Sequence, residues 1–294
     1  MWFWFTLAAV LFWGTADLFY KLCSDQGDRY SHLKIAVMVG AVMGVHALLH
    51  ILTNNIRYDP LNMVRYFPVS ALYMLSMIIG YAGLRYIELS VSSPVGNSSG
   101  AVAFILCIIF LGSDAAALQF TAAAVVSAGI FMLSLFEKQK KSVALSETGN
   151  EKKQSGLVAF LFPVLYCVID GLGTFADAMM LEAVMDEDQA LLSYEFTFFI
   201  TALAIAFYLI AVKKQRITTL WRKKHLAAGL LETAGQVFYI RAMALNAVLA
   251  APLVACYCVV SVLLSRLFIN ERLTRVQYAV IVLIVVAIGI LGIE

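Results

Sequence analysis

Charged residues are scarce in this sequence, and their scarcity excludes a soluble protein. Only 14% of the 294 residues are Asp, Glu, Lys or Arg, whereas 62% are hydrophobic and the mean hydropathy is +0.86. Soluble domains are about half apolar and about a quarter charged. The excess apolar surface therefore faces lipid. The net charge is only +2, and we expect no nucleic-acid partner.

Cysteine gives no sign of a disulfide framework or a metal site. The five cysteines are odd in number and lie inside apolar segments, at Cys23, Cys107, Cys167, Cys256 and Cys258. No two of them have the spacing of a zinc ligand pair or of a redox motif. We interpret them as packing residues and expect neither a metal nor a cofactor.

The hydrophobic residues form ten segments, each long enough to cross a bilayer. About 20 apolar residues span the hydrocarbon core, and backbone amides in lipid must bond within their own segment, which selects helices. The first segment has no basic region before it and no small-residue cleavage site after it, so we expect a retained helix. The segments are residues 2–23, 32–53, 63–84, 89–111, 115–136, 157–181, 190–212, 225–246, 249–269 and 275–293.

The pattern of apolar segments occurs twice along the chain, which indicates an internal repeat. Residues 91–113 and 249–271 begin 158 residues apart, and the same shift pairs Pro94 with Pro252 and Tyr81 with Tyr239. An odd number of helices per repeat inverts the second copy in the membrane. The sequence therefore predicts an all-α integral membrane protein of ten transmembrane helices in two inverted five-helix repeats. The repeats are residues 1–136 and 156–294, and the charged stretch 137–155 is the cytoplasmic linker.

Basic residues are divided unequally between the two sides of this arrangement. Of the 21 Lys and Arg residues, all but Arg57, Arg65 and Arg241 fall on one side. Cytoplasmic loops carry an excess of Lys and Arg. The pattern predicts a multi-pass protein of a bacterial plasma membrane, with both termini on the non-cytoplasmic side.

Polar side chains recur along single faces of two predicted helices. A charge at membrane depth costs a few kcal/mol, so such residues are expected to face a cavity or a partner. Spacings of three or four residues place them on one stripe. Neutral carboxyls held by hydrogen bonds, or an interhelical network, remain open alternatives to a binding site. The residues are Tyr166, Asp170 and Asp177 in the sixth segment and Glu232, Gln236 and Tyr239 in the eighth.

Further candidates lie in other segments. Asp17 and Lys21 are four residues apart and are interpreted chiefly as an ion pair, although Trp13 and Asp17 can also line an inner gate. Asn97 follows Pro94, which loosens the start of a helix. Tyr81 and Tyr257 complete the predicted binding set. Asp17, Asp170, Glu195 and Glu232 are the coupling candidates, whereas His46 and His50 are interpreted as packing or interfacial residues.

Several short motifs resemble the EamA branch of the drug/metabolite transporter superfamily. They are Phe12-Trp13-Gly14, the repeated prolines Pro94 and Pro252, and the stretch Leu267–Thr274. The resemblance covers essentially the whole chain. It implies ten helices, an inverted repeat and a central cavity for amino acids, amines, sugars, nucleotide sugars or drugs, in some members with proton coupling or exchange. At the 158-residue shift Glu271 pairs with Ser113, so the first repeat has no acidic residue at the matching position. We therefore interpret Glu271 as a capping or loop-fixing residue.

The sequence predicts a secondary active transporter of an amine, an amino acid or a similar nitrogenous metabolite. Buried carboxylates beside aromatic rings suit an organic cation or a proton, and both uses stay open. No Walker motif or soluble domain is present, which argues against ATP drive. The alternatives are a non-transporting scaffold or sensor and, remotely, an intramembrane hydrolase.

The hydrolase alternative depends on Gly96–Gly100, which matches a motif that needs a strand-to-helix elbow; we expect no enzyme. The expected partners are a small-molecule substrate, possible protons and membrane lipid. Gly40 and Gly44 permit close helix packing, within a monomer or in a homodimer.

Overall fold

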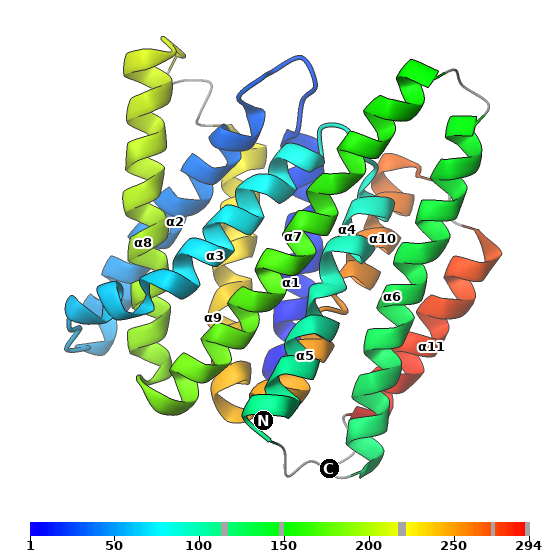
Figure 1. The fold of residues 1–294 in the computed structure, drawn as a ribbon. Helices are drawn as coiled ribbons and strands as arrows, with labels where there is room; N and C mark the ends of the chain where they lie inside the picture. The colour runs from blue at the N-terminus through cyan, green and yellow to red at the C-terminus, as the bar shows by residue number, and fades with distance from the viewer. Residues whose placement is uncertain (113–116, 147–149, 217–221, 272–273, 292–294) are drawn as a thin grey trace.

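Helices make up every regular element that the computed structural model describes (Figure 1). The described residues are 1–112, 117–146, 150–216, 222–271 and 274–291. Within them the expected all-α class is shown, and no strand occurs. The elements are α1 (Trp2–Cys23), α2 (Ser31–Asn54), α3 (Leu61–Gly83), α4 (Leu89–Asn97), α5 (Ser99–Phe110), α6 (Ala117–Ser146), α7 (Asn150–Ala183), α8 (Glu187–Phe207), α9 (Lys223–Val254), α10 (Tyr257–Leu264) and α11 (Arg275–Leu291), with π-helical turns at Tyr208–Val212 and Ser265–Ile269.

Seven helical stretches of the described chain are long and apolar enough to cross a membrane, and shorter apolar helices cover Ala117–Ile130 and Arg275–Ile290. The stretch Lys223–Ile269 has 47 residues. At 1.5 Å per residue it would reach roughly 70 Å, about twice the hydrocarbon thickness. The non-helical backbone of Asn246 (φ −163°, ψ 84°) interrupts it. The integral membrane class is supported, and ten crossings stay a prediction.

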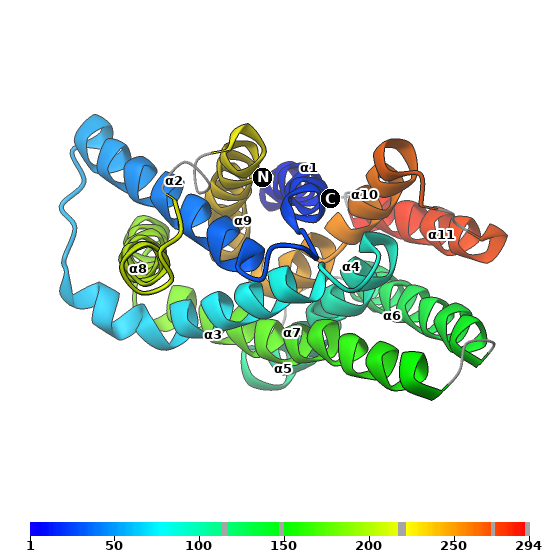
Figure 2. The same ribbon diagram turned by 90° about the horizontal axis from the view of Figure 1, so that it is seen from above.

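Helices from the two ends of the sequence pack in pairs. α1 packs against α9, α2 against α8, α3 against α7 and α6 against α11. Seen from above, α9, α1 and α10 form one row and α3, α7 and α6 another (Figure 2). α1 begins and α11 ends at the same end of the bundle, and α1 and α7 run in opposite directions (Figure 1). Each pair thus joins an early helix to a late one.

Two glycines explain the close contact between α2 and α8. A side chain at Gly40 would collide with the carbonyl oxygen of Phe198, and one at Gly44 would collide with the ring of Phe199. The predicted close approach at these glycines is confirmed. It joins two helices of one chain, because the small surfaces are already covered by α8.

Two helical stretches break one turn after a proline. α4 gives way to α5 at Ser98, and α9 gives way to α10 at Ala255 and Cys256. Proline lacks the N–H that would continue the helical ladder, and its ring crowds the preceding turn. The Ser98 hydroxyl donates to the carbonyl of Pro94 (3.1 Å), and the Cys256 thiol contacts that of Pro252 (3.8 Å). The 158-residue shift relates the two breaks.

The start of α4 is held by the segment that follows the second break. Glu271 accepts hydrogen bonds from the backbone N–H groups of Leu89 (3.0 Å) and Ser90 (2.8 Å). These N–H groups have no partner within the helix, and a carboxylate there also meets the positive end of the helix dipole. The predicted capping role of Glu271 is confirmed.

Candidate functional site

A cavity lies where the two broken stretches meet α1, α3, α7 and α9. Its volume is about 90 Å³, several times the 10–15 Å³ that one water needs on the same measure. Three carboxyl groups line it, from Asp17, Asp170 and Glu232, and its lining holds no Lys, Arg or His among the described residues. Eight aromatic side chains also line the cavity: Trp13, Tyr20, Tyr73, Tyr81, Tyr166, Tyr194, Tyr239 and Tyr257.

Asp17 is held in place by two serines from different broken stretches. The hydroxyls of Ser93 in α4 and Ser261 in α10 each donate to Oδ2 at 2.7 Å. Asp17 is partly exposed although it lies within the bundle, and it lines the cavity. Two hydroxyls therefore fix one oxygen of a carboxyl group in the cavity wall.

Lys21, one helical turn after Asp17, reaches the region where α3 ends. The Lys21 ammonium donates to the backbone carbonyls of Leu84 (2.8 Å) and Ile87 (2.5 Å). These carbonyls lie where α3 ends, and the last carbonyls of a helix have no partner within it. The lysine therefore contacts a neighbouring chain segment, and its pairing with Asp17 stays a prediction.

Asp170 occupies a second, similar position on α7. Ser99, the first residue of α5, donates to Oδ2 at 2.8 Å, and Ser76 of α3 lies 3.4 Å from Oδ1. Asp170 is also partly exposed within the bundle. Ser93 and Ser99 stand on either side of the break at Ser98, so one broken stretch orients both aspartates.

Glu232 forms the third acidic wall on α9. It is 5% exposed, and the Tyr20 hydroxyl donates to its Oε2 at 2.6 Å. One turn later, Gln236 is 1% exposed, and its Nε2 has no hydrogen-bond partner although it lines the cavity. A buried N–H without an acceptor is unfavourable. Gln236 is therefore a donor available to a bound molecule.

Two aromatic rings of the cavity wall pack directly against glycines of a neighbouring helix. Trp13 of α1 lies over Gly235 of α9, and Tyr166 of α7 lies over Gly80 of α3. Trp13 also donates its ring N–H to the carbonyl of Glu232 (3.2 Å). In each case the aromatic residue precedes a cavity aspartate by four residues, so ring and carboxyl share one face of the helix.

Tyrosine hydroxyls connect the rings across the cavity. Those of Tyr166 and Tyr257 are 3.1 Å apart, and those of Tyr73 and Tyr239 are 2.6 Å apart. The rings of Trp13 and Tyr239 have centroids 4.9 Å apart. The sequence did not single out Ser76, Ser93, Ser261 or Tyr73, because an isolated serine or tyrosine in an apolar helix carries no directional signal. Ser99 was noticeable in the sequence as part of the polar stretch with Asn97 that follows Pro94.

The structure brings most of the predicted site residues to this one cavity, and their role in binding stays a prediction. Lining it are Trp13, Tyr81, Asn97, Tyr166, Asp170, Glu232, Gln236, Tyr239 and Tyr257, together with the coupling candidate Asp17. Asp177 lies elsewhere: it is fully buried and accepts a hydrogen bond from the Tyr66 hydroxyl.

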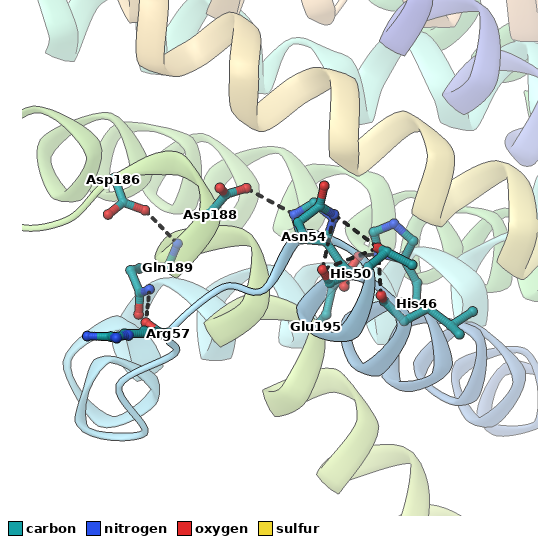
Figure 3. Close-up of polar contacts among 10 residues, drawn as sticks. His46, His50, Asn54, Arg57, Asp186, Asp188, Gln189 and Glu195 are labelled. Carbon is teal, nitrogen blue, oxygen red and sulfur yellow. Dashed lines mark hydrogen bonds and ion pairs between the residues drawn. The ribbon is translucent and has the colours of Figure 1, made fainter.

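Glu195 also lies outside the cavity, in a polar chain between α2 and α8 (Figure 3). The His46 Nδ1 is 2.8 and 2.9 Å from its two oxygens, and Glu195 is fully buried. His50 Nε2 lies 3.0 Å from an oxygen of Asp188, and the two imidazole rings are stacked. The histidines are thus acid partners as well as packing residues.

Comparison with known proteins identifies the second half of the chain. Residues 157–293 match the model of the EamA-like transporter family. This part of the chain is therefore similar to the EamA-like transporter family. The resemblance to the drug/metabolite transporter superfamily is thereby confirmed. The EamA-like half supplies Tyr166, Asp170, Glu232 and Tyr257 to the cavity.

A solved crystal structure shares the overall fold. The likeness covers 97% of this chain and 98% of the other, with a TM-score of 0.65 and 14% sequence identity. At that identity it shows the fold alone. No curated protein matches the sequence.

Proposed function

We propose that the protein is a secondary active transporter that carries a small polar nitrogenous metabolite across the membrane by alternating access. The observation that carries the proposal is the cavity itself, in which Asp17, Asp170 and Glu232 meet between two broken helical stretches. Carboxyl groups at membrane depth are costly, and they mark substrate or ion pathways in membrane proteins. Broken helices at the interface of two repeats are a common substrate site in transporters.

Ten crossings in two inverted repeats are part of the proposal. Exchanging the predicted halves, residues 1–136 and 156–294, maps the pairs α2–α8 and α6–α11 onto themselves. The same exchange maps α1–α9 onto α3–α7. The exchange also maps the contact of Trp13 in α1 with Gly235 in α9 onto that of Tyr166 in α7 with Gly80 in α3. This correspondence supports two copies of one unit, joined through residues 137–155.

The coupling step is assigned to the cavity carboxyls. Asp170 and Glu232 come from facing helices of the second half, and each is held by a hydroxyl from the first. A group that binds either substrate or proton makes the two compete, which drives coupled transport or exchange. Asp177 and Glu195, which are covered by Tyr66 and His46, have structural roles in this proposal.

Uptake into proteoliposomes with and without an imposed proton gradient tests the proposal. Asp170→Asn and Glu232→Gln keep the size of each side chain and remove its charge. We expect each variant to lose most uptake and the response of uptake to pH. If both variants transport like the parent protein with the same pH dependence, the assigned site is wrong.

The control is Glu182→Gln, which removes an exposed carboxyl from the same helix as Asp170. We expect it to transport normally. If it loses activity to the same extent, the losses seen in Asp170→Asn and Glu232→Gln come from the changed charge of the protein or from a folding defect, and not from the cavity. Thermal unfolding of every variant in detergent separates the last case.

A further inference from the structure

We infer that the ligand of this cavity is an organic cation that carries no carboxylate and presents a neutral hydrogen-bond acceptor. The inference rests on the proposed function and narrows its substrate to amines with a hydroxyl or carbonyl oxygen. Zwitterionic amino acids and neutral sugars are excluded. Three features of the cavity lead to this class: the sign of its charges, the placement of its rings and the free amide of Gln236.

The charge of the lining has one sign. Asp17, Asp170 and Glu232 face the cavity, and no basic side chain lines it among the described residues. The nearest lysine along α1, Lys21, directs its ammonium to the carbonyls of Leu84 and Ile87. A ligand carboxylate would enter with no counter-charge and would meet like charges at low dielectric. A protonated amine is attracted to the same groups.

Each aspartate forms a complete half-site for a cation. Serine hydroxyls fix Oδ2 of Asp17 and Oδ2 of Asp170. Trp13 and Tyr166 stand one turn before these aspartates on the same helix faces, and Tyr257 lies against both rings. An ammonium beside a carboxylate and over aromatic faces gains both charge pairing and cation–π attraction. The half-sites come from opposite halves of the chain.

Gln236 adds a requirement that a bare cation would not satisfy. Its Nε2 is a buried donor without a hydrogen-bond partner among the described residues. The amide of Asn97, which also lines the cavity, already donates to the carbonyl and the hydroxyl of Ser93. A bound molecule that offers an oxygen restores the missing hydrogen bond. The amide is uncharged, so it suits a hydroxyl or carbonyl oxygen as well as an anion. The charge of the lining excludes the anion.

Matched ligands test the inference on the purified full-length protein. Thermal shift and equilibrium binding are measured with amines and their α-carboxylated counterparts: ethanolamine with serine, tyramine with tyrosine, histamine with histidine, and agmatine with arginine. A specific ligand raises the unfolding temperature by mass action. We expect at least one amine to bind and its amino acid to bind at least about tenfold more weakly, because a charged contact is worth roughly a factor of ten.

Variants then assign the contacts. Asp17→Asn and Asp170→Asn are each expected to weaken binding of that amine about tenfold or more. Gln236→Leu is expected to abolish the preference for a hydroxylated amine over its deoxy analogue, such as ethanolamine over ethylamine. Glu182→Gln is the control and is expected to bind like the parent. The matched-ligand comparison needs no variant, so it stands even if one of them fails to fold.

The outcomes separate this inference from the proposed function. If an amino acid binds as tightly as its amine, or if only sugars or other neutral solutes bind, the inference is overturned while transport through the cavity still stands. If amines bind but neither aspartate variant nor Gln236→Leu changes their affinity, the assigned contacts are wrong. If no solute of any class binds or is transported, the proposed function fails as well.

Discussion

At the scale of single residues, the cavity depends on where glycine is allowed. Trp13 and Tyr166 press on Gly235 and Gly80, and a methyl group at either glycine would come within 3 Å of the ring. Aromatic rings of this size cannot move aside without disturbing the neighbouring aspartate. The smallest residues in α3 and α9 therefore control the position of the cavity walls.

Gly80→Ala and Gly235→Ala are accordingly expected to destabilise the protein by about 1–3 kcal/mol, the usual cost of overpacking, and to reduce ligand binding. The matched control is Gly289→Ala in α11, where a methyl group meets nothing within 4 Å. There the change should be neutral or stabilising, because alanine favours a helix over glycine by roughly 0.5–1 kcal/mol. Unfolding temperatures in detergent measure the difference. Equal behaviour of the three variants would refute the packing argument.

The polar residues show what a sequence can and cannot predict at this scale. Helical spacing placed Glu232 with Gln236, and Tyr166 with Asp170, on common faces, because these relations lie within one helix. Asp17 accepts hydrogen bonds from Ser93 and Ser261, which lie in two other helices. The partner of Glu195, His46, is separated from it by 149 residues. Such contacts depend on how helices pack, and nothing in the local pattern fixes that.

At the scale of elements, a few side chains hold helix ends and turns in place. Arg85 donates to the carbonyls of Asp25, Gln26 and Arg29 and holds the turn between α1 and α2. In the same turn, Asp28 accepts from the Lys34 ammonium (2.7 Å) and the Tyr30 N–H (2.9 Å). Loosening after Pro94 was predictable from the sequence, because proline acts on its own helix. The N–H groups that Glu271 caps belong to Leu89 and Ser90, which lie far away along the chain, so only the structure identifies them.

Asp28 gives this turn a predictable dependence on pH. Burial raises the pKa of its carboxyl, but the hydrogen bonds from Lys34 and Tyr30 outweigh burial, and the pKa falls below its ordinary value. A lowered pKa means that the carboxylate stabilises the fold fully above its ordinary pKa of about 3.9. That stabilisation is lost as the pH falls through the lower value of the folded state.

The unfolding temperature of the parent protein should therefore exceed that of Asp28→Asn at pH 6 to 7. This difference in unfolding temperature should shrink as the pH is lowered below about 4, where the carboxyl group of the unfolded chain is protonated before that of the folded protein. Thermal unfolding across this range is the measurement, and Asp59→Asn is a comparison at another exposed loop. A gap that widens towards acid would contradict the assignment.

At the scale of the whole molecule, the sequence predicted the helical membrane class from its composition and its long apolar segments, since a helix satisfies its own backbone hydrogen bonds in lipid. The number of crossings was harder to predict, because apolar runs can merge or break. Lys223–Ile269 is one apolar run by hydropathy, yet Asn246 divides it. Its side chain accepts a hydrogen bond from the N–H of Leu249 (3.1 Å), as a helix cap does. Hydropathy alone therefore does not show where one helix of this stretch ends and the next begins.

The arrangement in the membrane leads to the last prediction. The turn between α1 and α2 and the turn between α7 and α8 lie at opposite ends of the bundle (Figure 1). Gln26 and Glu187 are exposed in or beside these turns, and four of the five native cysteines are buried. In intact cells a membrane-impermeant thiol reagent should label Glu187→Cys, whereas Gln26→Cys should react only after permeabilisation. The reason is that Lys and Arg gather on the side of Gln26, which the charge rule places inside. Labelling of both positions from one side would mean that the bundle does not cross the bilayer as proposed, and labelling from the reversed sides would invert its orientation.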